Sequence, residues 1–373
     1  MNNPHIEVDL GKICHNTRTV VGRLKARGIR VTGVTKAVCG HPAIAQAMLD
    51  GGASGLGEAR LSNVKRLRQV GMTCPITLIR TPMPSQVEDV VHVCEASYNT
   101  EMAVISALAV AALRQNTVHG IILMVEMGDR REGIMPQDLH DMAQRTVETP
   151  GVTLNGIGAN FACLSGIAPT KAKMKALSGL ANEIEGQCGP FLQTVSGGNS
   201  ANLPWATGGH ATGRINDLRI GEAILLGIDP ITGDQIGGMF QDAFTLVVEV
   251  IETDAGSVPP CVGTVDPSLA RLRLVPDTSE TTRIILAIGS QDTDAAGLSM
   301  PAGTILIGAT SDHFVMGTHD TTLSVGAEMR FNMNYSALMR AMAAPDIQTN
   351  FRENRSPPNA RDVDGPSKHP ALV

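Results

Sequence analysis

A single lysine stands at the end of a predicted buried strand, in the segment VTGVTKAVCG at residues 31 to 40. Lysine is almost never buried without a partner or a task, because an ammonium group is costly to desolvate. Lys36 therefore has two interpretations. Either the strand simply reaches the surface there, or the amine is held at the mouth of a site, where it can act as a nucleophile or a proton carrier.

Further polar residues follow other apolar runs, among them Arg131 in GDRREG, Asn160 in GIGAN and Arg219 in LRIG. Two glycine-rich turns, VSGGNSANL with Ser200 and LRIGEA with Gly221, can cradle a phosphate with backbone N-H groups. Each turn alone favours a purely structural role, and it is their joint placement after neighbouring strands that favours a phosphate site. Together with a lysine, a phosphate cradle favours pyridoxal phosphate, whose aldehyde forms a Schiff base with an amine.

The elements that must position these residues alternate regularly between short apolar runs and helical segments. Repeated strand and helix units require parallel pairing, and eight of them favour a closed (β/α)8 TIM barrel, with function at the carboxyl ends of the strands. We expect the barrel in residues 1–235. Its strands are predicted at residues 30–35, 53–57, 75–80, 91–97, 118–128, 152–160, 192–198 and 215–221.

From residue 236 the pattern changes to β-rich segments separated by Gly, Pro, Asp and Ser, without a helix long enough for a crossover. This predicts a smaller all-β domain at 236–342. The polar, proline-rich residues 343–373 are expected to form a disordered tail.

Composition excludes several classes of protein. The chain has 373 residues, 43% of them hydrophobic, and a net charge of -6, which gives no basic face for nucleic acid. Its seven cysteines are scattered and predict neither a disulfide framework nor a metal site. The start has no secretory pattern, and the longest apolar run is too short to span a bilayer, so we expect a cytoplasmic protein without membrane partners.

The motifs resemble those of a known family. EVDLGKICHN followed by a strand that ends in TKA is similar to the start of the alanine racemase fold, the fold type III pyridoxal phosphate enzymes. VEMGDRREG, GIGANFAC, VSGGNSANL, LRIGEAILLG, AIGSQDTD and GATSDHF resemble the ornithine racemase branch of that superfamily, over about residues 5–340. The resemblance implies an amino-acid racemase that exchanges the α-proton through an external aldimine.

The resemblance also implies roles for individual residues. Lys36 would carry pyridoxal 5'-phosphate and act as one acid/base, and Arg131 would contact the cofactor's phenolic oxygen or the substrate carboxylate. Asn160 would lie against the pyridine ring, and Arg219 would face its nitrogen. Since arginine does not give up its proton, the ring would remain a weak electron sink. The phosphate would be held by Ser200, Gly221 and Tyr335.

The second acid/base departs from the family pattern. Alanine racemases place a tyrosine of the β domain, reached across a dimer interface, where this chain has Ser290 in GSQD. The candidates to replace it are Asp292, Asp312 and His313. His313 has the most suitable ordinary pKa, although a histidine after a strand is commonly structural. The implied assembly is a homodimer with shared sites.

Three functions remain open from the sequence. The first is a racemase of a free amino acid, with a basic substrate such as ornithine or lysine read by Glu132, Asp292, Asp294 or Asp312. The second is an aldolase of the same fold acting on β-hydroxy amino acids, often with a divalent metal; SDH at 311–313 is the weak signal for that metal. The third is a non-catalytic pyridoxal phosphate carrier, against which the substantial β domain argues.

Overall fold

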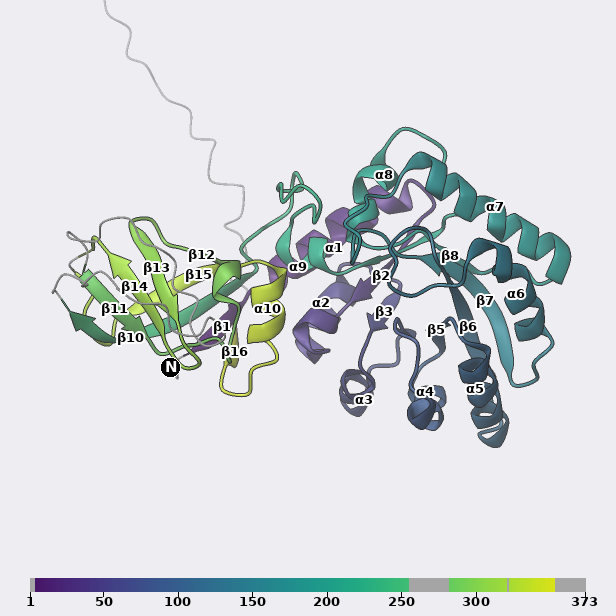
Figure 1. The fold of residues 1–373 in the computed structure, drawn as a ribbon, viewed down its shortest axis with the longest axis horizontal. Helices are drawn as coiled ribbons and strands as arrows, with labels where there is room; N and C mark the ends of the chain where they lie inside the picture. The colour runs from purple at the N-terminus through teal and green to yellow at the C-terminus, as the bar shows by residue number, and fades with distance from the viewer. Residues whose placement is uncertain (1–3, 255–281, 321, 353–373) are drawn as a thin grey trace, which may run out of the picture.

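The computed structural model describes residues 4–254, 282–320 and 322–352. Two bodies lie side by side, a barrel wrapped in helices and a β domain, with α9 and α10 where they meet (Figure 1). Within the described residues, no helix is long and apolar enough to cross a membrane.

The barrel is closed by eight parallel strands in the order β2 to β9, which confirms the predicted fold class. β6 is buried at all seven positions, the pattern of a strand covered on both faces. The strands are β2 (Arg30–Val34), β3 (Gly55–Glu58), β4 (Ile76–Leu78), β5 (Ala96–Asn99), β6 (His119–Val125), β7 (Val152–Ala159), β8 (Thr194–Ser196) and β9 (Asp217–Ile220).

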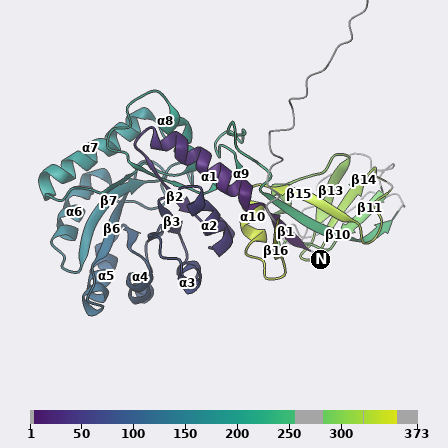
Figure 2. The same cartoon turned by 180° about the vertical axis from the view of Figure 1, so that it is seen from behind.

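Helices cover the outside of the barrel, and a further helix, α1, precedes its first strand (Figure 2). α1 begins where the Asp9 carboxylate accepts a hydrogen bond from the N-H of Lys12 at 3.0 Å, an N-cap that satisfies one free donor. The helices are α1 (Leu10–Lys25), α2 (Pro42–Asp50), α3 (Leu61–Gln69), α4 (Val87–Val93), α5 (Met102–Arg114), α6 (Leu139–Val147), α7 (Lys171–Cys188), α8 (Leu203–Thr207) and α9 (Glu222–Leu226).

One strand was predicted in the wrong place. The run VHVCEAS at 91–97 begins in α4, which ends at Val93, and only its last two residues belong to the strand Ala96–Asn99. The apolar residues of α4 face the core at helical spacing, whereas the strand carries polar Ser97, Tyr98 and Asn99, all buried.

The β domain is a largely antiparallel sheet around β10, which pairs with β1, β11 and β15. FVMGT at 314–318 forms β14, which the sequence reading did not single out. The strands are β1 (His5–Val8), β10 (Phe244–Asp254), β11 (Thr282–Leu286), β12 (Leu298–Ser299), β13 (Thr304–Ala309), β14 (Phe314–Thr318), β15 (Glu328–Met333) and β16 (Gln348–Phe351), and α10 spans Tyr335–Ala341.

Two segments at opposite ends of the chain belong to this sheet. β1 pairs in parallel with β16, His5 opposite Gln348 and Val8 opposite Phe351. The expectation of a disordered tail from residue 343 is therefore wrong for residues 343–352, which end in a paired strand. Residues 353–373 lie outside the described part. A domain boundary at 235/236 stays a proposal, and β1 shows that residues 5–8 pair with the second body.

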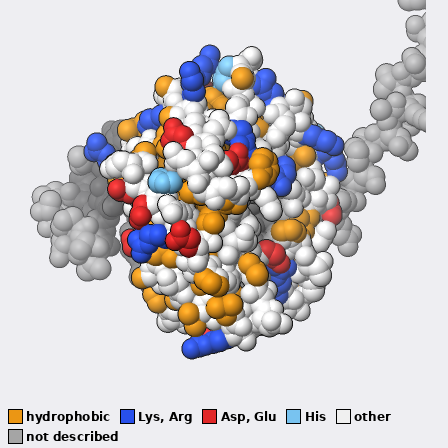
Figure 3. Space-filling model, turned by 90° about the vertical axis from the view of Figure 1, so that its right-hand side faces the viewer, with side chains coloured by type: hydrophobic (Ala, Val, Ile, Leu, Met, Phe, Trp, Pro, Cys, Tyr) orange, Lys and Arg blue, Asp and Glu red, His pale blue; other side chains and the backbone are white. Residues whose placement is uncertain are grey.

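Figure 3 shows the side of the barrel that is remote from the β domain. Basic and acidic side chains are interspersed there among apolar ones, without a field of one sign. This face offers no electrostatic footprint for a strongly charged partner.

Candidate active site

A cavity of about 720 Å³ opens at the carboxyl ends of the barrel strands. Its size suits a small-molecule site. The structure brings eight sequence-predicted residues to its wall, from the barrel and from α10: Lys36, Arg131, Glu132, Asn160, Ser200, Arg219, Gly221 and Tyr335.

Lys36 begins a short 3-10 turn, η1 (Lys36–Val38), directly after β2. The turn ends at Cys39 in the left-handed region, with φ of 52°. The next residue, Gly40, has φ of 59°, and a Cβ there would lie 2.8 Å from Asn63 Cβ, so a glycine is required for this close turn. α10 packs against η1, so Tyr335 approaches Lys36 from the β domain.

The Lys36 side chain is exposed, but to the cavity that it lines. Burial among the surrounding groups lowers its pKa, and the charges of Arg131 and Arg219 act in the same direction. A larger neutral fraction than an ordinary lysine has is what a nucleophilic or proton-accepting amine requires.

Sequence reasoning missed Glu58, which ends β3 and is fully buried near Lys36. It accepts hydrogen bonds from the Thr35 hydroxyl at 2.9 Å and from the N-H groups of Ala59 and Arg60. Burial raises its pKa. The sequence feature that could have identified Glu58 is its position at the end of β3, the strand that pairs with β2 before Lys36.

Arg219 is held inside the barrel by hydrogen bonds to four groups. It donates to the Ser196 hydroxyl at 2.6 Å, the Tyr98 hydroxyl at 3.0 Å, the Ala159 carbonyl at 2.8 Å and Asn160 Oδ1 at 2.6 Å. The guanidinium also lies 4.6 Å from the centre of the Tyr98 ring. The orientation of the Arg219 guanidinium is therefore fixed by hydrogen bonds on several sides.

A buried carboxylate lies below Arg219. Asp217 accepts hydrogen bonds from the Ser196 hydroxyl at 2.6 Å and the Thr32 hydroxyl at 2.7 Å. Ser196 thus connects the carboxylate to Arg219. We call Asp217, Ser196, Arg219, Tyr98 and Asn160 the axial network, because it runs inside the barrel towards the cavity.

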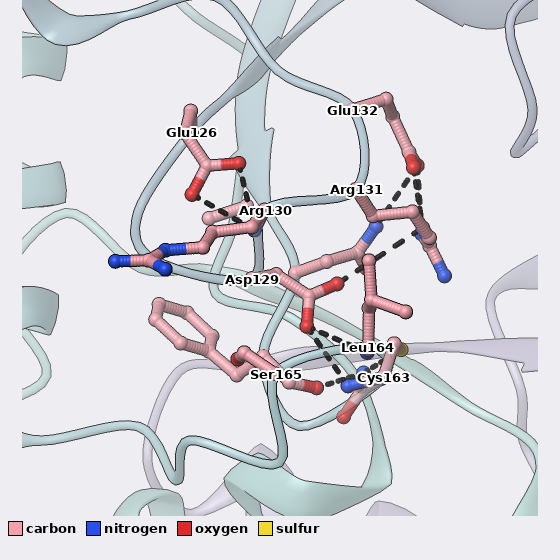
Figure 4. A network of polar contacts seen from close by, with 12 residues as sticks. Glu126, Asp129, Arg130, Arg131, Glu132, Cys163, Leu164 and Ser165 are labelled. Carbon is pink, nitrogen blue, oxygen red and sulfur yellow. Dashed lines mark hydrogen bonds and ion pairs between the residues drawn. The ribbon is translucent and has the colours of Figure 1, made fainter.

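Arg131 reaches the cavity from the loop after β6, drawn in Figure 4. Its Nε and Nη2 donate to the two carboxylate oxygens of Glu132, and Glu132 Oε1 also accepts from Asn160 Nδ2 at 3.3 Å. The Glu132 carboxylate raises the pKa of Arg131, whose charge is retained.

The loop that carries Arg131 is tied to the loop after β7. Asp129 Oδ1 accepts from the N-H groups of Cys163 and Leu164, both at 3.0 Å (Figure 4). Glu126 accepts from the N-H groups of Gly128 and Arg130. These bonds fix two strand-end loops beside the cavity.

The turn after β8 has the glycine requirement that the sequence suggested. Gly198 has φ of 134°, and a Cβ there would lie 2.2 Å from Asn202 Oδ1. Asn199 and Asn202 cap the turn reciprocally, which places Ser200 at the cavity wall. The Ser200 hydroxyl accepts from the N-H of Ala223 at 3.2 Å, next to Gly221.

This set of side chains fits pyridoxal phosphate. An amine is available at Lys36, a fixed cation at Arg219, and hydroxyl donors at Ser200 and Tyr335, all on one cavity. Within the described residues the Tyr335 hydroxyl makes no hydrogen bond of its own, so it is free to bind an anion.

The candidates for the second acid/base do not line the cavity. Asp292 accepts from the N-H of Gly289 at 2.9 Å, Asp312 accepts from Gln291 Nε2 at 2.9 Å, and His313 is exposed. Residues 289–292 and 310–313 lie together on the β domain, where the N-H of Ser290 donates to the Thr310 carbonyl at 2.8 Å. In the described part of the chain, no cluster of three or more His, Cys, Asp or Glu could hold a metal ion.

Comparison with known proteins gives matches along most of the chain. The family model for the N-terminal domain of alanine racemase matches residues 8–229. A lysine racemase of Thermotoga maritima is 34% identical, covering 92% of this chain and 97% of that protein. An ornithine racemase of Acetoanaerobium sticklandii is 31% identical, covering 92% and 98%.

Solved structures share the fold at low identity. An alanine racemase from Streptomyces lavendulae has a TM-score of 0.76 at 18% identity, covering 95% of this chain and 98% of that one. A D-threonine aldolase from Filomicrobium marinum has a TM-score of 0.71 at 13% identity, covering 91% and 88%. At these identities the likeness concerns the fold.

Proposed function

The chain belongs to the alanine racemase family and is an isomerase of amino acids, and we propose that it is a pyridoxal phosphate-dependent racemase of a basic amino acid such as ornithine or lysine. The observation that carries the proposal is the position of Lys36 in one cavity with Arg219, Ser200 and Tyr335. Support for a basic substrate comes from the two racemases that match over 92% of the chain.

When bound, pyridoxal phosphate would withdraw electrons from the α-carbon and so acidify its proton. Ser200, Gly221 and Tyr335 would hold its phosphate, and Asn160 and Arg219 its ring. Arg219 would face the ring with a guanidinium, a group that donates hydrogen bonds and does not serve as a proton donor in proteins. It therefore supplies a constant charge rather than an acid.

Racemisation removes a proton from one face of the α-carbon and returns one on the other, so two acid/base groups are needed. Lys36 can hold a proton at Nζ on the first face. Arg131, oriented by Glu132, can donate to the substrate carboxylate from Nη1, because the ion pair occupies Nε and Nη2. Both groups come from the barrel.

The second group would come from a homodimer. The barrel's own cavity receives Tyr335 from the β domain, while Asp292, Asp312 and His313 lie elsewhere on that domain. In our proposal the β domain of a second copy faces the cavity and places His313 there, with Asp292 and Asp312 nearby. A cytoplasmic location remains a prediction.

The test is α-proton exchange in deuterated water, followed by NMR, with chiral chromatography of the products. Ornithine, lysine, alanine and threonine are supplied as separate enantiomers, with and without pyridoxal phosphate. We expect cofactor-dependent exchange with inversion on ornithine or lysine. Cleavage of threonine in the presence of a divalent metal would instead support the aldolase, and cofactor binding without any exchange would support the carrier.

A further inference from the structure

Charge is unevenly distributed around the cavity. Among the described residues, four basic side chains line it, Lys36, Arg80, Arg131 and Arg219, against two acidic ones, Glu132 and Glu222. The basic excess suits a phosphate and an α-carboxylate. Within one chain, a substrate with a second ammonium group could pair only with one of these two carboxylates.

Glu132 is already engaged. Both of its oxygens accept from Arg131, and one also accepts from Asn160. Moving it to a ligand would release Arg131 and break the contact to Asn160.

The aspartates considered from the sequence are engaged too, and none lines the cavity. Asp294 accepts from the Ser336 hydroxyl at 2.7 Å and from the N-H of Ala296 at 3.2 Å. Asp312 accepts from Gln291 and from the Ser311 hydroxyl. These contacts hold turns of the β domain.

Glu222 differs from all of these. It is the first residue of α9, directly after Gly221, and its half-buried side chain reaches the cavity wall. Within the described residues it makes no hydrogen bond and no ion pair. Its electrostatic neighbours are Lys36, Asp229 and Tyr335. Burial raises its pKa, and the Lys36 charge opposes that rise.

We propose that Glu222 determines specificity by forming an ion pair with the distal ammonium of a basic substrate, from the same cavity wall as Lys36. This inference rests on the proposed function and deepens it. A half-buried carboxylate without a partner gains a charge-assisted hydrogen bond from such a ligand and gains none from an apolar side chain. Discrimination is large when the wrong substrate leaves a buried polar group unpaired.

A competing role for Glu222 is to tune Lys36, since the two groups interact. The two roles predict different results. A change that acts through Lys36 would slow every amino acid by the same factor, whereas loss of the substrate contact would affect only those that carry a distal ammonium.

The experiment compares ornithine with norleucine, which has a methyl group in place of the ammonium, in the wild type and in Glu222→Gln. We expect kcat/KM for ornithine to fall about 10- to 100-fold, with norleucine changed by less than about threefold. The dissociation constant of ornithine, from the change in absorbance of the bound cofactor, should rise by a similar factor. Asp234→Asn removes an exposed carboxylate outside the cavity and should leave both substrates unchanged.

A second variant protects the test against a folding defect. Glu222→Asp keeps the charge and withdraws it by one methylene, so it should raise the preference for lysine over the shorter ornithine. Equal losses on ornithine and norleucine, or an unchanged lysine to ornithine ratio in Glu222→Asp, would overturn the inference. A wild-type protein that racemises alanine but neither basic amino acid would instead refute the proposed substrate class.

Discussion

Two regions carry polar side chains proposed for the site: the axial network of the barrel, and the paired turns 289–292 and 310–313 of the β domain. They differ in burial and in hydrogen bonding. Asp217, Ser196 and Arg219 are buried, and each is bonded to the next at 2.6 Å. His313 and Asp312 are exposed and do not reach the cavity. One half of the proposed chemistry is thus preorganised within the chain, and the other half is displayed on a surface.

The free-energy cost of burying a charged group explains this difference in burial. A buried guanidinium or carboxylate must have its hydrogen bonds satisfied in the folded chain, because an unpaired buried charge is strongly destabilising. Exposed groups bear no such requirement, since water satisfies them. The barrel groups are therefore fixed by folding, while the β-domain groups can be fixed by association.

The largest expected effect tests the preorganised half. Lys36→Ala should lower racemisation about 10²- to 10⁴-fold or more, because it removes both an acid/base group and the amine that would bind the cofactor. The visible absorbance of lysine-bound cofactor should disappear with it. Activity assays and absorbance spectra measure the two effects.

The matched control is Lys65→Ala, which removes a half-exposed lysine paired with Asp89 on the outside of the barrel. It should retain both signals. If Lys36→Ala keeps the absorbance and the activity, the assignment of Lys36 fails.

An intermediate effect tests the displayed half. His313→Ala should reduce racemisation about 10²-fold or more, while exchange of the α-proton from one enantiomer persists with retention of configuration, because one acid/base group remains. NMR in deuterated water and chiral chromatography separate these outcomes.

His319→Ala, an exposed histidine of the same domain, is the control. Full racemisation by His313→Ala would transfer the role to Asp312 or Asp292 and make Asp312→Asn the next variant.

The smallest expected effect sharpens the axial network. Asp217→Asn removes the carboxylate charge that Arg219 reaches through Ser196, and we expect kcat/KM to fall about tenfold, the scale of outer-shell changes in other sites. The absorbance maximum of the bound cofactor should shift, a signature that a purely structural defect would not produce. Thr32→Val removes one donor to the same carboxylate and should have a smaller effect in the same direction. An unchanged absorbance spectrum in both variants would contradict the idea that Asp217 influences Arg219 through Ser196.

Local pattern was enough to predict the barrel and the strand-end residues. Apolar runs and helical segments gave the order of units, and the rule that function lies at carboxyl ends grouped Lys36, Asn160 and Arg219 in advance. It failed at β5, where an apolar helix precedes a strand with a polar interior. Local pattern also missed Glu222, because the motif LRIGEA was interpreted only through Gly221, as a phosphate-binding turn.

Pairing between distant segments could not be read from local pattern. The sequence around His5 and Gln348 has no periodicity that indicates that these residues pair in neighbouring strands. Nor could the sequence place the turns that carry Asp292 and His313 relative to the cavity, since their position depends on how the β domain sits beside the barrel.

The pairing of β1 with β16 has a consequence for biosynthesis. The last barrel strand ends at Ile220, so the barrel can close while the ribosome is still adding the β domain. β1, although made before every barrel strand, must wait for β10 and finally for Phe351 before its two neighbours exist. Domains generally fold as units during synthesis, and non-local pairing is slow because the loop must close first. A strand that leaves the ribosome before the barrel is thus among the last of the described strands to be paired.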